Sequence, residues 1–383
     1  MDPIRVAISG ARGIPALYGG FETFAEELAP RLVQRGFEVT VYCRPRYSDA
    51  ARPAQFRGVR LVYLPSIGHR ALESPSAELV SSLHALKNRY DILYVLGFRA
   101  SAVYWPHRAL GRTLVFNTDG FDWQRSKWGG LARRYLRVSA GLGVRLGRAG
   151  LVADSRVTAD YYAHTYGRRP VYLSYGAPLL TSPSPEIVAA YGLESGRYHL
   201  VVARVDPENH VRSIIEAYLQ SASRVPLAVV GSQNYDTPYG AAVKALQCDR
   251  VRMLGGVYAA GHLDALYQGC LAYIHGHEVG GTNPSLVRAM GAGALVLAND
   301  VSYNREVLSD AGLYWSPGAE DLPDLIRRVE SDAVLGARLR AAARARAAQE
   351  YDWEAIADGY ADYFSALAGR ARAPSETGLQ PAA

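Results

Sequence analysis

Short β-rich runs alternate with longer helical stretches along most of the 383-residue chain. The runs are rich in Val, Ile, Leu and Tyr, as strands of a parallel sheet buried on both faces should be. In the first half we expect strands at 4–9, 38–43, 60–64, 91–96, 113–117 and 151–153. In the second half we expect them at 199–203, 227–231, 251–254, 271–275, 294–298 and 312–314.

The first two runs enclose a predicted helix at 21–35. Its apolar residues Phe24, Leu28 and Leu32 recur every four positions and so share one helix face. Gly36 stands where a helix C-cap belongs. Strand, loop, helix and strand form a βαβ unit, and its repetition predicts a parallel sheet with helices on both faces. The expected fold class is α/β, with two doubly wound domains.

The length of the chain also favours two domains, at roughly 150 residues each. Pro178, Pro183 and Pro185 punctuate the expected joint at 174–185. We expect an N-terminal domain at 1–175 and a second domain at 176–350. An amphipathic helix at 351–368 is expected to pack back on the first domain, and 369–383 to form a flexible tail.

Composition excludes several classes of protein. Hydrophobic residues make up 49% of the chain and charged residues 20%, which excludes wholesale disorder. The three cysteines are too few and too scattered for a disulfide framework or a zinc cluster. We find neither a signal-peptide pattern at the start nor an uncharged apolar stretch of about 18 residues. A cytoplasmic location follows as an expectation.

The net charge of +6 is unevenly distributed. Residues 1–175 carry 25 Lys and Arg against 13 Asp and Glu, which gives +12, so residues 176–383 carry −6. A basic half suggests that this half faces an anionic partner such as a membrane surface. The alternative is that the uneven charge reflects compositional drift without a function, because Arg is the usual basic residue throughout the chain.

Ligands of doubly wound sheets bind at the carboxyl ends of the strands, so the loops after strands are the places to look for chemistry. The first such loop, 10–23, contains Gly10, Gly13, Gly19 and Gly20 and opens the first helix. Glycines let backbone amides approach an anion. The loop is too long for a dinucleotide fingerprint, and Arg44 follows the second strand where an acidic residue would be needed. A turn without a ligand remains the alternative.

A second cluster, 117–128, follows the fifth predicted strand. Asp119 and Asp122 could act on a hydroxyl group, and Arg125 and Lys127 could hold a phosphate. Trp123 and Trp128, expected to be exposed, could stack on a sugar ring. An ordinary N-cap and helix start is the alternative.

The following stretch, 131–148, reads as a basic amphipathic helix with five arginines among apolar residues. Such a helix can lie in a membrane interface and attract anionic lipid. A helix that faces the core and solvates its arginines is the favoured interpretation.

Two clusters stand out in the second half. Arg204 ends a strand, where its guanidinium could pair with a diphosphate, although such an arginine is as often part of a surface ion pair. The stretch 275–290 contains a strand end, a glycine pair and a helix start near Pro284. Thr282 or Asn283 can cap that helix, whose free amides favour an anion. The His-x-His-Glu pattern at 275–278 lacks the helical spacing of a zinc site, so we expect no metal.

Three motifs together resemble a known family: Gly-Gly-Phe-Glu-Thr at 19–23, Asn-Thr-Asp-Gly-Phe-Asp-Trp at 117–123 and His-Gly-His-Glu-Val-Gly-Gly-Thr-Asn-Pro-Ser-Leu at 275–286. They look like those of bacterial rhamnosyltransferase-type enzymes among the retaining GT-B glycosyltransferases of family 4. The resemblance extends from about residue 4 to about residue 365 and implies two Rossmann-like domains that face each other across a cleft.

The resemblance implies a metal-independent transfer of a hexosyl group, with L-rhamnose from a dTDP donor as the best assignment. It implies no cofactor, a lipid-diphosphate-linked sugar as acceptor, no nucleic-acid partner, and a peripheral position on the inner face of the membrane. We expect the catalytic residues to be Asp119, Arg204 and Glu278. The expected donor-binding residues are Gly19, Gly20, Arg204, His210, Gly280, Gly281, Thr282, Asn283, Ser285 and Leu286. The expected acceptor-binding residues are Phe21, Glu22, Asp119, Asp122, Trp123 and Arg125.

The sequence departs from the family pattern at two positions. Many relatives carry a Glu that takes the nucleotide ribose hydroxyls where this chain has Arg288, and a guanidinium has only donors. His210 stands where many relatives have Lys. Two other functions therefore remain open: a nucleotide-sugar 2-epimerase of the same architecture, and an inactive glycosyltransferase-like protein that acts as a binding partner.

Overall fold

The computed structural model describes residues 2–16, 19–48, 51–69, 72–118, 120–125, 128–232 and 237–370. Contacts divide the chain into two units. Unit 1 comprises the chain up to Gln124, residues 128–175 and the segment from Trp353 onward. Unit 2 comprises residues 176–352 together with the short segment 125–127.

Unit 1 is built on a sheet in which neighbouring strands run parallel, apart from the short antiparallel pair at one edge. Its first strand lies in the middle, so the chain winds outward first to one side and then to the other. The strands across the sheet are β3 (Gln55–Phe56), β4 (Val59–Tyr63), β2 (Glu38–Cys43), β1 (Arg5–Ser9), β5 (Ile92–Leu96), β6 (Thr113–Asn117), β7 (Gly150–Ala153) and β8 (Val171–Tyr172).

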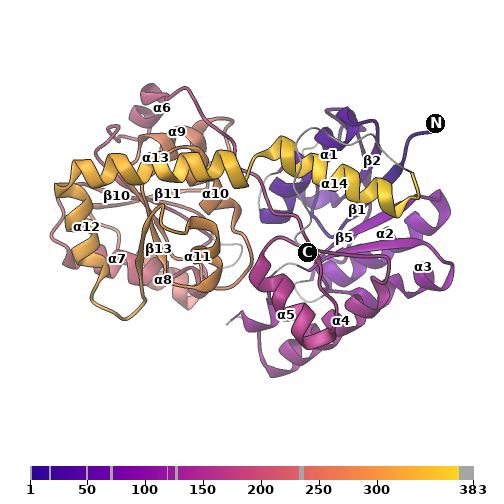
Figure 1. The fold of residues 1–383 in the computed structure, drawn as a ribbon. Coiled ribbons are helices and arrows are strands. Elements are labelled where there is room, and N and C mark those ends of the chain that lie inside the picture. Colours follow the sequence, from indigo (N-terminus) through magenta and orange to yellow (C-terminus); the bar gives the residue numbers. More distant parts are fainter. Residues whose placement is uncertain are drawn as a thin grey trace. The chain divides into compact units, whose positions relative to one another are not determined.

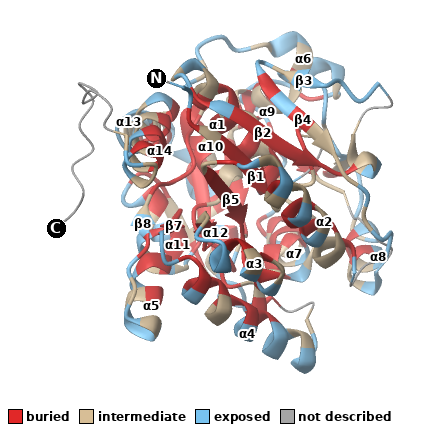
Figure 2. Cartoon of the chain, turned by 90° about the vertical axis from the view of Figure 1, so that its right-hand side faces the viewer, coloured by how far each residue is buried: buried red, intermediate tan, exposed pale blue. Residues whose placement is uncertain are grey.

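Helices cover both faces of this sheet (Figure 1). They are α1 (Gly20–Gln34), α2 (Glu73–Asn88), α3 (Trp105–Ala109), α4 (Gly130–Leu146), α5 (Arg156–Tyr166) and α14 (Trp353–Leu367), with single 3₁₀ turns at η1 (Pro45–Tyr47), η2 (Ser101–Tyr104) and η3 (Asp122–Gln124). The central strands β1 and β5 are almost wholly buried (Figure 2). Both faces of these strands are buried, and for this reason apolar residues occupy successive positions along them.

The last helix of the chain, α14, packs beside α1 in unit 1 (Figure 1). Phe24 on α1 lies 5.6 Å from Tyr360 on α14, measured between ring centroids. At the rim, Arg35 forms an ion pair of 2.8 Å with Asp358 and one of 3.0 Å with Glu354. A segment more than 300 positions away in sequence thus completes the apolar cover over α1.

Unit 2 repeats the same winding on a second sheet in which all neighbouring strands run parallel. Its strands, in order across the sheet, are β11 (Val251–Gly255), β10 (Leu227–Val230), β9 (His199–Val202), β12 (Ala272–His275), β13 (Val296–Asn299) and β14 (Leu313–Trp315).

The helices of unit 2 pack on the faces of this sheet. They are α6 (Pro185–Ala190), α7 (Val211–Gln220), α8 (Pro238–Lys244), α9 (His262–Gly269), α10 (Pro284–Gly291), α11 (Ser302–Leu308), α12 (Leu322–Ser331) and α13 (Ala333–Glu350), with a 3₁₀ turn at η4 (Pro207–Asn209). Val229, Ile274 and Leu297 from the strands and Ile214 from α7 have no exposed surface and form the centre of the core.

The expectation of two doubly wound parallel-sheet α/β domains is confirmed. Every strand run predicted from the sequence contains a strand, and the helix predicted at 21–35 is α1. The edge strands β3 and β8 were missed, because two residues are too few to show alternation. No helix among the described residues has both the length and the apolar character to cross a bilayer.

Close helix packing generates a stability prediction at Gly143 on α4. A Cβ at this position would lie 2.1 Å from a ring carbon of Phe98 and 2.7 Å from Oγ of Ser101, so Gly143→Ala forces the helix away from its support. We expect the melting temperature to fall by several degrees, from overpacking that costs roughly 1–3 kcal/mol.

Gly141→Ala on the same helix is the matched control. A Cβ there meets its nearest neighbour, a ring carbon of Tyr166, at 3.4 Å. Because Ala is the better helix former, the free energy of unfolding of this variant should equal that of the wild type or exceed it by up to about 1 kcal/mol. Its melting temperature should therefore be equal or slightly higher. Equal melting temperatures for the two variants in differential scanning calorimetry would show that α4 does not pack this tightly.

Candidate functional site

In both units the winding reverses between two neighbouring strands, β1 and β5 in unit 1 and β9 and β12 in unit 2. Loops that follow such a pair of strands diverge to opposite faces and leave a crevice at the carboxyl edge, where ligands of these sheets bind. The loops concerned are 10–19 and 97–100 in unit 1, and 203–210 and 276–283 in unit 2. They contain eight of the seventeen site residues expected from the sequence.

In unit 2 the side chain of Asn209 ties the two crevice loops together. Its amide nitrogen donates a 2.8 Å hydrogen bond to the carbonyl of Arg204, and its amide oxygen accepts a 2.7 Å bond from Nδ1 of His277. A Cβ at Gly276 would lie 2.2 Å from the backbone oxygen of Asn209, so only glycine allows the loops to approach this closely. The position of Arg204 is therefore fixed against the loop that leads into α10.

The structure brings together two of the expected site residues, His210 and Glu278. His210 adopts a left-handed backbone conformation with φ of 51° just before α7. Its Nε2 lies 3.0 Å from Oε2 of Glu278, whose own backbone amide donates to the carbonyl of Glu208 at 3.1 Å. The imidazole and the carboxylate thus form a polar pair across the two loops, and the carboxylate remains half exposed.

The two histidines of the β12 loop supply no positive charge at neutral pH. Burial lowers the pKa of His275 to about 3. Burial, together with the neighbouring His275 and the charges of Arg125 and Arg204, lowers the pKa of His277 well below its ordinary value. The guanidinium of Arg204 lies 3.5 Å from Asp206, and about one third of its side chain is exposed. Positive charge near these histidines therefore comes from arginines, Arg125 and Arg204.

The start of α10 is built as the sequence predicted, with Pro284 in the first turn and Asn283 as the N-cap. The Asn283 side chain accepts hydrogen bonds from the amide (2.9 Å) and the hydroxyl (2.6 Å) of Ser285. Gly280, Gly281 and Thr282 are buried, and the fully buried Leu286 belongs to the core. The partial positive charge of the α10 N-terminus is thus directed at this loop.

Arg288, which departs from the family pattern, lies further along α10. Its Nε donates a 2.6 Å hydrogen bond to Oδ1 of Asp264 on α9. The charge of Arg288 is therefore matched by a carboxylate of unit 2 itself.

In unit 1 the first loop is held by carboxylates of α1. Glu22 accepts a 2.7 Å hydrogen bond from the amide of Arg12, and Glu26 accepts one of 2.6 Å from the amide of Ala16. Gly19 and Gly20, at the start of the helix, are exposed. The protein thus already places negative charge beside the N-terminus of α1, where a carboxylate is favourable.

Phe21 and the second sequence cluster lie beside this loop. Phe21 is buried with the guanidinium of Arg99 5.7 Å from its ring centroid, and the same arginine donates a 2.9 Å hydrogen bond to Asp122. Arg125, grouped with unit 2, is buried 3.6 Å from Glu208. Asp119 lies outside the described residues.

The expected exposure of Trp123 is wrong. Its side chain is only 5% exposed, and its ring packs 5.3 Å from Phe121 and 6.0 Å from Tyr161. Phe121 directly precedes η3 and Tyr161 lies on α5, and the local sequence cannot show how these segments pack. A direct stacking role for Trp123 on a sugar ring does not fit this burial.

Sequence reasoning missed three buried ionisable residues of unit 1: Arg44, Glu73 and Glu78. Arg44 follows β2, and the two glutamates lie on the first turns of α2. Burial raises the pKa of Glu78 to about 7, against the lowering effect of Arg99 and Arg44. The available signal was the small residues Ala77 and Ser81 around Glu78, which mark a helix face that packs closely.

Metal-ligating side chains do not gather in threes or more anywhere in the described ranges of the chain.

The low pKa of His275 generates a stability prediction. Its folded-state pKa of about 3 lies below the unfolded value of about 6.5. Between these two pH values the unfolded chain binds a proton at this residue and the folded chain does not. Stability is therefore lost as the pH falls from 7 to 5, by about 2 kcal/mol for this residue.

His275→Gln removes this titration, and calorimetry at pH 7 and pH 5 should show a smaller loss of stability for the variant than for the wild type. His164→Gln, at an exposed position of α5, is the control and should keep the wild-type response. An unchanged pH response in His275→Gln would mean that the imidazole is not held neutral.

Comparison with known proteins identifies both halves of the chain. Residues 4–178 match a family described as a domain of unknown function, DUF1972, and residues 184–347 match the family of glycosyl transferases group 1. No curated protein matches the sequence.

Solved glycosyltransferase structures share the fold over nearly the whole chain. Sucrose-phosphate synthase from Thermosynechococcus elongatus is 17% identical, with a TM-score of 0.77 over 95% of this chain and 99% of that one. HepE from Anabaena in complex with UDP and glucose is 19% identical, with a TM-score of 0.76 over 95% of this chain and 100% of that one. WaaG, a glycosyltransferase involved in lipopolysaccharide biosynthesis, is 17% identical, with a TM-score of 0.69 over 94% and 99%. The chain therefore has the GT-B fold of these glycosyltransferases, and its residues 184–347 match the group 1 glycosyltransferase family.

Proposed function

We propose that the protein is a retaining, metal-independent hexosyltransferase that uses a nucleotide-sugar donor, with dTDP-L-rhamnose as the best assignment. The acceptor is a hydroxyl group of a lipid-diphosphate-linked sugar in cell-surface polysaccharide synthesis. Family 4, the sugar and the retaining outcome come from the motif resemblance. Nucleotide-sugar binding is also supported by the HepE structure, which holds UDP and glucose.

One observation carries the donor site: the loops after β9 and β12 are joined through Asn209, which fixes Arg204 beside the loop that opens α10. When a glycosidic bond to a diphosphate breaks, negative charge grows on the leaving diphosphate. A guanidinium and the amides of a helix N-terminus stabilise that charge where it develops. Arg204 and the backbone amides of Gly281, Thr282 and Asn283 would therefore do the work that a divalent cation does elsewhere.

The remaining donor-side residues would contact the donor or leave room for it. His210 and Glu278, 3.0 Å apart, would face the sugar or the diphosphate together, as a polar pair able to donate from the ring and accept on the carboxylate. Gly280 and Gly281 leave room for the ligand at the backbone. On the acceptor side, Phe21, Glu22 and Asp122 lie at the loops of unit 1, and Asp119 keeps its proposed acceptor role.

The first test is Arg204→Ala. Loss of one charge-assisted hydrogen bond to the diphosphate should lower kcat/KM by about 10- to 100-fold. Nucleoside-diphosphate release measures the activity, after a thermal-shift panel of dTDP-, UDP- and GDP-sugars has identified the donor by mass action.

The control is Arg212→Ala, at an exposed arginine of α7 that pairs with Glu216, which should keep wild-type activity. Turnover of Arg204→Ala within about threefold of wild type would contradict the assigned role. The epimerase alternative is tested by incubating the donor alone and looking for an isomer by NMR, where this proposal predicts none.

A membrane surface as partner is supported by α4. Leu136, Val144 and Leu146 of this helix face the core, as expected. Leu131, Tyr135 and Val138, however, are exposed at 88%, 51% and 65%, and they recur at helical spacing on one face. Arg133, Arg134 and Arg137 are exposed beside them. Apolar residues flanked by arginines match an anionic lipid interface.

The double variant Leu131→Ser/Val138→Ser tests this surface by co-sedimentation with phosphatidylglycerol-containing vesicles. Because apolar area drives insertion of such a helix, binding should fall by about fivefold or more. Leu110→Ser, at another strongly exposed leucine of unit 1, is the control and should bind like the wild type. Equal binding by wild type and double variant would exclude α4 as the contact.

A further inference from the structure

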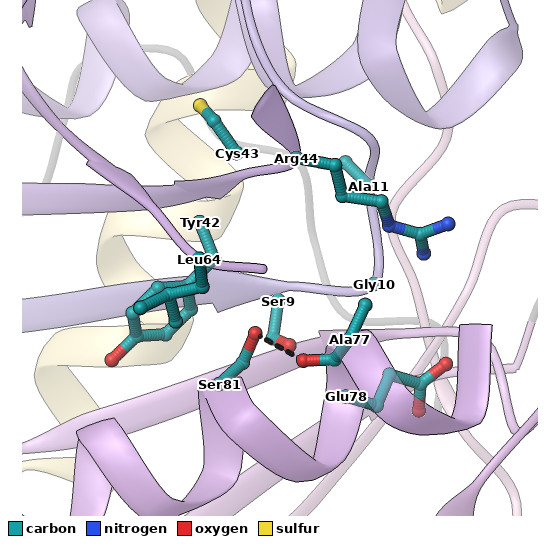
Figure 3. Close-up of a pocket in the computed structure, with 10 residues that line it drawn as sticks. All are labelled: Ser9, Gly10, Ala11, Tyr42, Cys43, Arg44, Leu64, Ala77, Glu78 and Ser81. Atoms are coloured by element: carbon teal, nitrogen blue, oxygen red, sulfur yellow. Dashed lines mark hydrogen bonds between the residues drawn. The ribbon is translucent and has the colours of Figure 1, made fainter. Parts of the chain in front are cut away.

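Unit 1 contains a small pocket that none of the expected site residues lines. It lies at the carboxyl ends of β1 and β2, against the first turns of α2 (Figure 3). Its cavity volume of about 10 Å³ is room for a single water molecule or hydroxyl group. The lining residues are Ser9, Gly10, Ala11, Tyr42, Cys43, Arg44, Leu64, Ala77, Glu78 and Ser81.

Two charged side chains in this lining are buried with polar atoms left unsatisfied. Arg44 is 5% exposed and Glu78 is 2% exposed. Among the described residues, Nε of Arg44 and Oε2 of Glu78 have no hydrogen-bond partner. The two side chains extend toward the same side of the pocket in Figure 3. A buried charged atom without a partner is costly, so a ligand atom or a water molecule is expected there.

The other polar groups of the lining are already satisfied. Ser9 is hydrogen-bonded to the hydroxyl of Tyr104 at 3.0 Å, and Ser81 donates to the carbonyl of Ala77 at 2.8 Å. Arg44 lies only loosely against Glu73, with 3.6 Å between Nη1 and Oε1. The unmet hydrogen-bonding capacity of the pocket therefore consists of one guanidinium N–H and one carboxylate oxygen.

This pair selects the chemistry of the ligand. A phosphate group has only acceptors and would meet the negative charges of Glu73 and Glu78. An ammonium group has only donors and would meet Arg44 and Arg99. A hydroxyl group donates one hydrogen bond and accepts others, so it matches both kinds of unpaired atom without bringing a charge.

We propose that this pocket binds a ring hydroxyl of the acceptor sugar, which donates to Glu78 and accepts from Arg44. The inference rests on the proposed function, because it assigns the acceptor of that reaction to unit 1. It makes Arg44 and Glu78 specificity-determining residues that read the sugar and not its diphosphate. Sites that hydrogen-bond a substrate hydroxyl reject the deoxy analogue strongly, because its absence leaves buried polar atoms unpaired.

The test measures acceptor binding by calorimetric titration without donor. The probes are octyl-diphosphate-linked glucose, galactose and N-acetylglucosamine, with the monodeoxy analogues of whichever binds. Glu78→Gln and Arg44→Lys should each weaken binding of the best acceptor by about tenfold or more. One deoxy analogue should bind the wild type and Glu78→Gln equally weakly, because it lacks the hydroxyl whose hydrogen bond the variant has lost.

Glu330→Gln in unit 2 is the matched control, since Glu330 is a partly buried carboxylate that hydrogen-bonds His199 at 2.7 Å, away from the pocket. It should leave acceptor binding unchanged. A merely structural role for Glu78 would lower affinity for every analogue by the same factor and would overturn the proposal. Affinities of Glu78→Gln and Arg44→Lys within about twofold of wild type would mean that the pocket holds water only.

Donor binding separates this proposal from the proposed function. Thermal shifts by nucleotide sugars should be the same in wild type, Glu78→Gln and Arg44→Lys, and their melting temperatures without ligand report whether the variants fold. If no nucleotide sugar shifts the melting temperature of the wild type, the proposed function fails. The acceptor titration then still tests whether the pocket binds a sugar hydroxyl. If donors bind but none of the three acceptors does, the pocket assignment is overturned alone.

Discussion

The arrangement of unit 2 depends on one side-chain amide. Asn209 donates to the carbonyl of Arg204 and accepts from His277, and so joins the loops that follow the two strands where the sheet changes its winding direction. His275 at the end of β12 and His277 in the loop after it are kept neutral by burial, so this junction adds no charge of its own. The backbone of Arg204 and the loop that leads into α10 are thereby held in place, so that the Arg204 guanidinium and the loop amides can act on an anion, as preorganised donors stabilise developing charge.

The two units present different charged groups at the carboxyl edges of their sheets. In unit 2 the crevice combines a partly exposed cation with a helix N-terminus, which suits a diphosphate. In unit 1 the carboxylates of Glu22 and Glu26 already bind the amides of the first loop. Arg99 and Arg44 at this edge already lie against acidic partners, Asp122 and Glu73, which suits neutral hydroxyl groups better than a second anion. A donor recognised through charge and an acceptor recognised through hydroxyls are consistent with sugar transfer.

The sequence predicted what depends on local pattern and missed what depends on distant packing. Continuous apolar runs located the central strands, and Pro284 with Asn283 located the start of α10, because both signals are local. The burial of Trp123 against Phe121 and against Tyr161 of α5 could be seen only in the tertiary structure. The same holds for Glu78, which looks like any helix-surface glutamate until α2 packs on the sheet, and for Arg288, whose partner Asp264 lies on a different helix.

A crystal structure of the protein with a bound nucleotide sugar tests the central claim most directly. The account predicts diphosphate oxygens within hydrogen-bonding distance of the Arg204 guanidinium and of the backbone amides between Gly281 and Asn283, with no cation between ligand and protein. A diphosphate bound at another edge of unit 2, or held through a divalent cation, would contradict it.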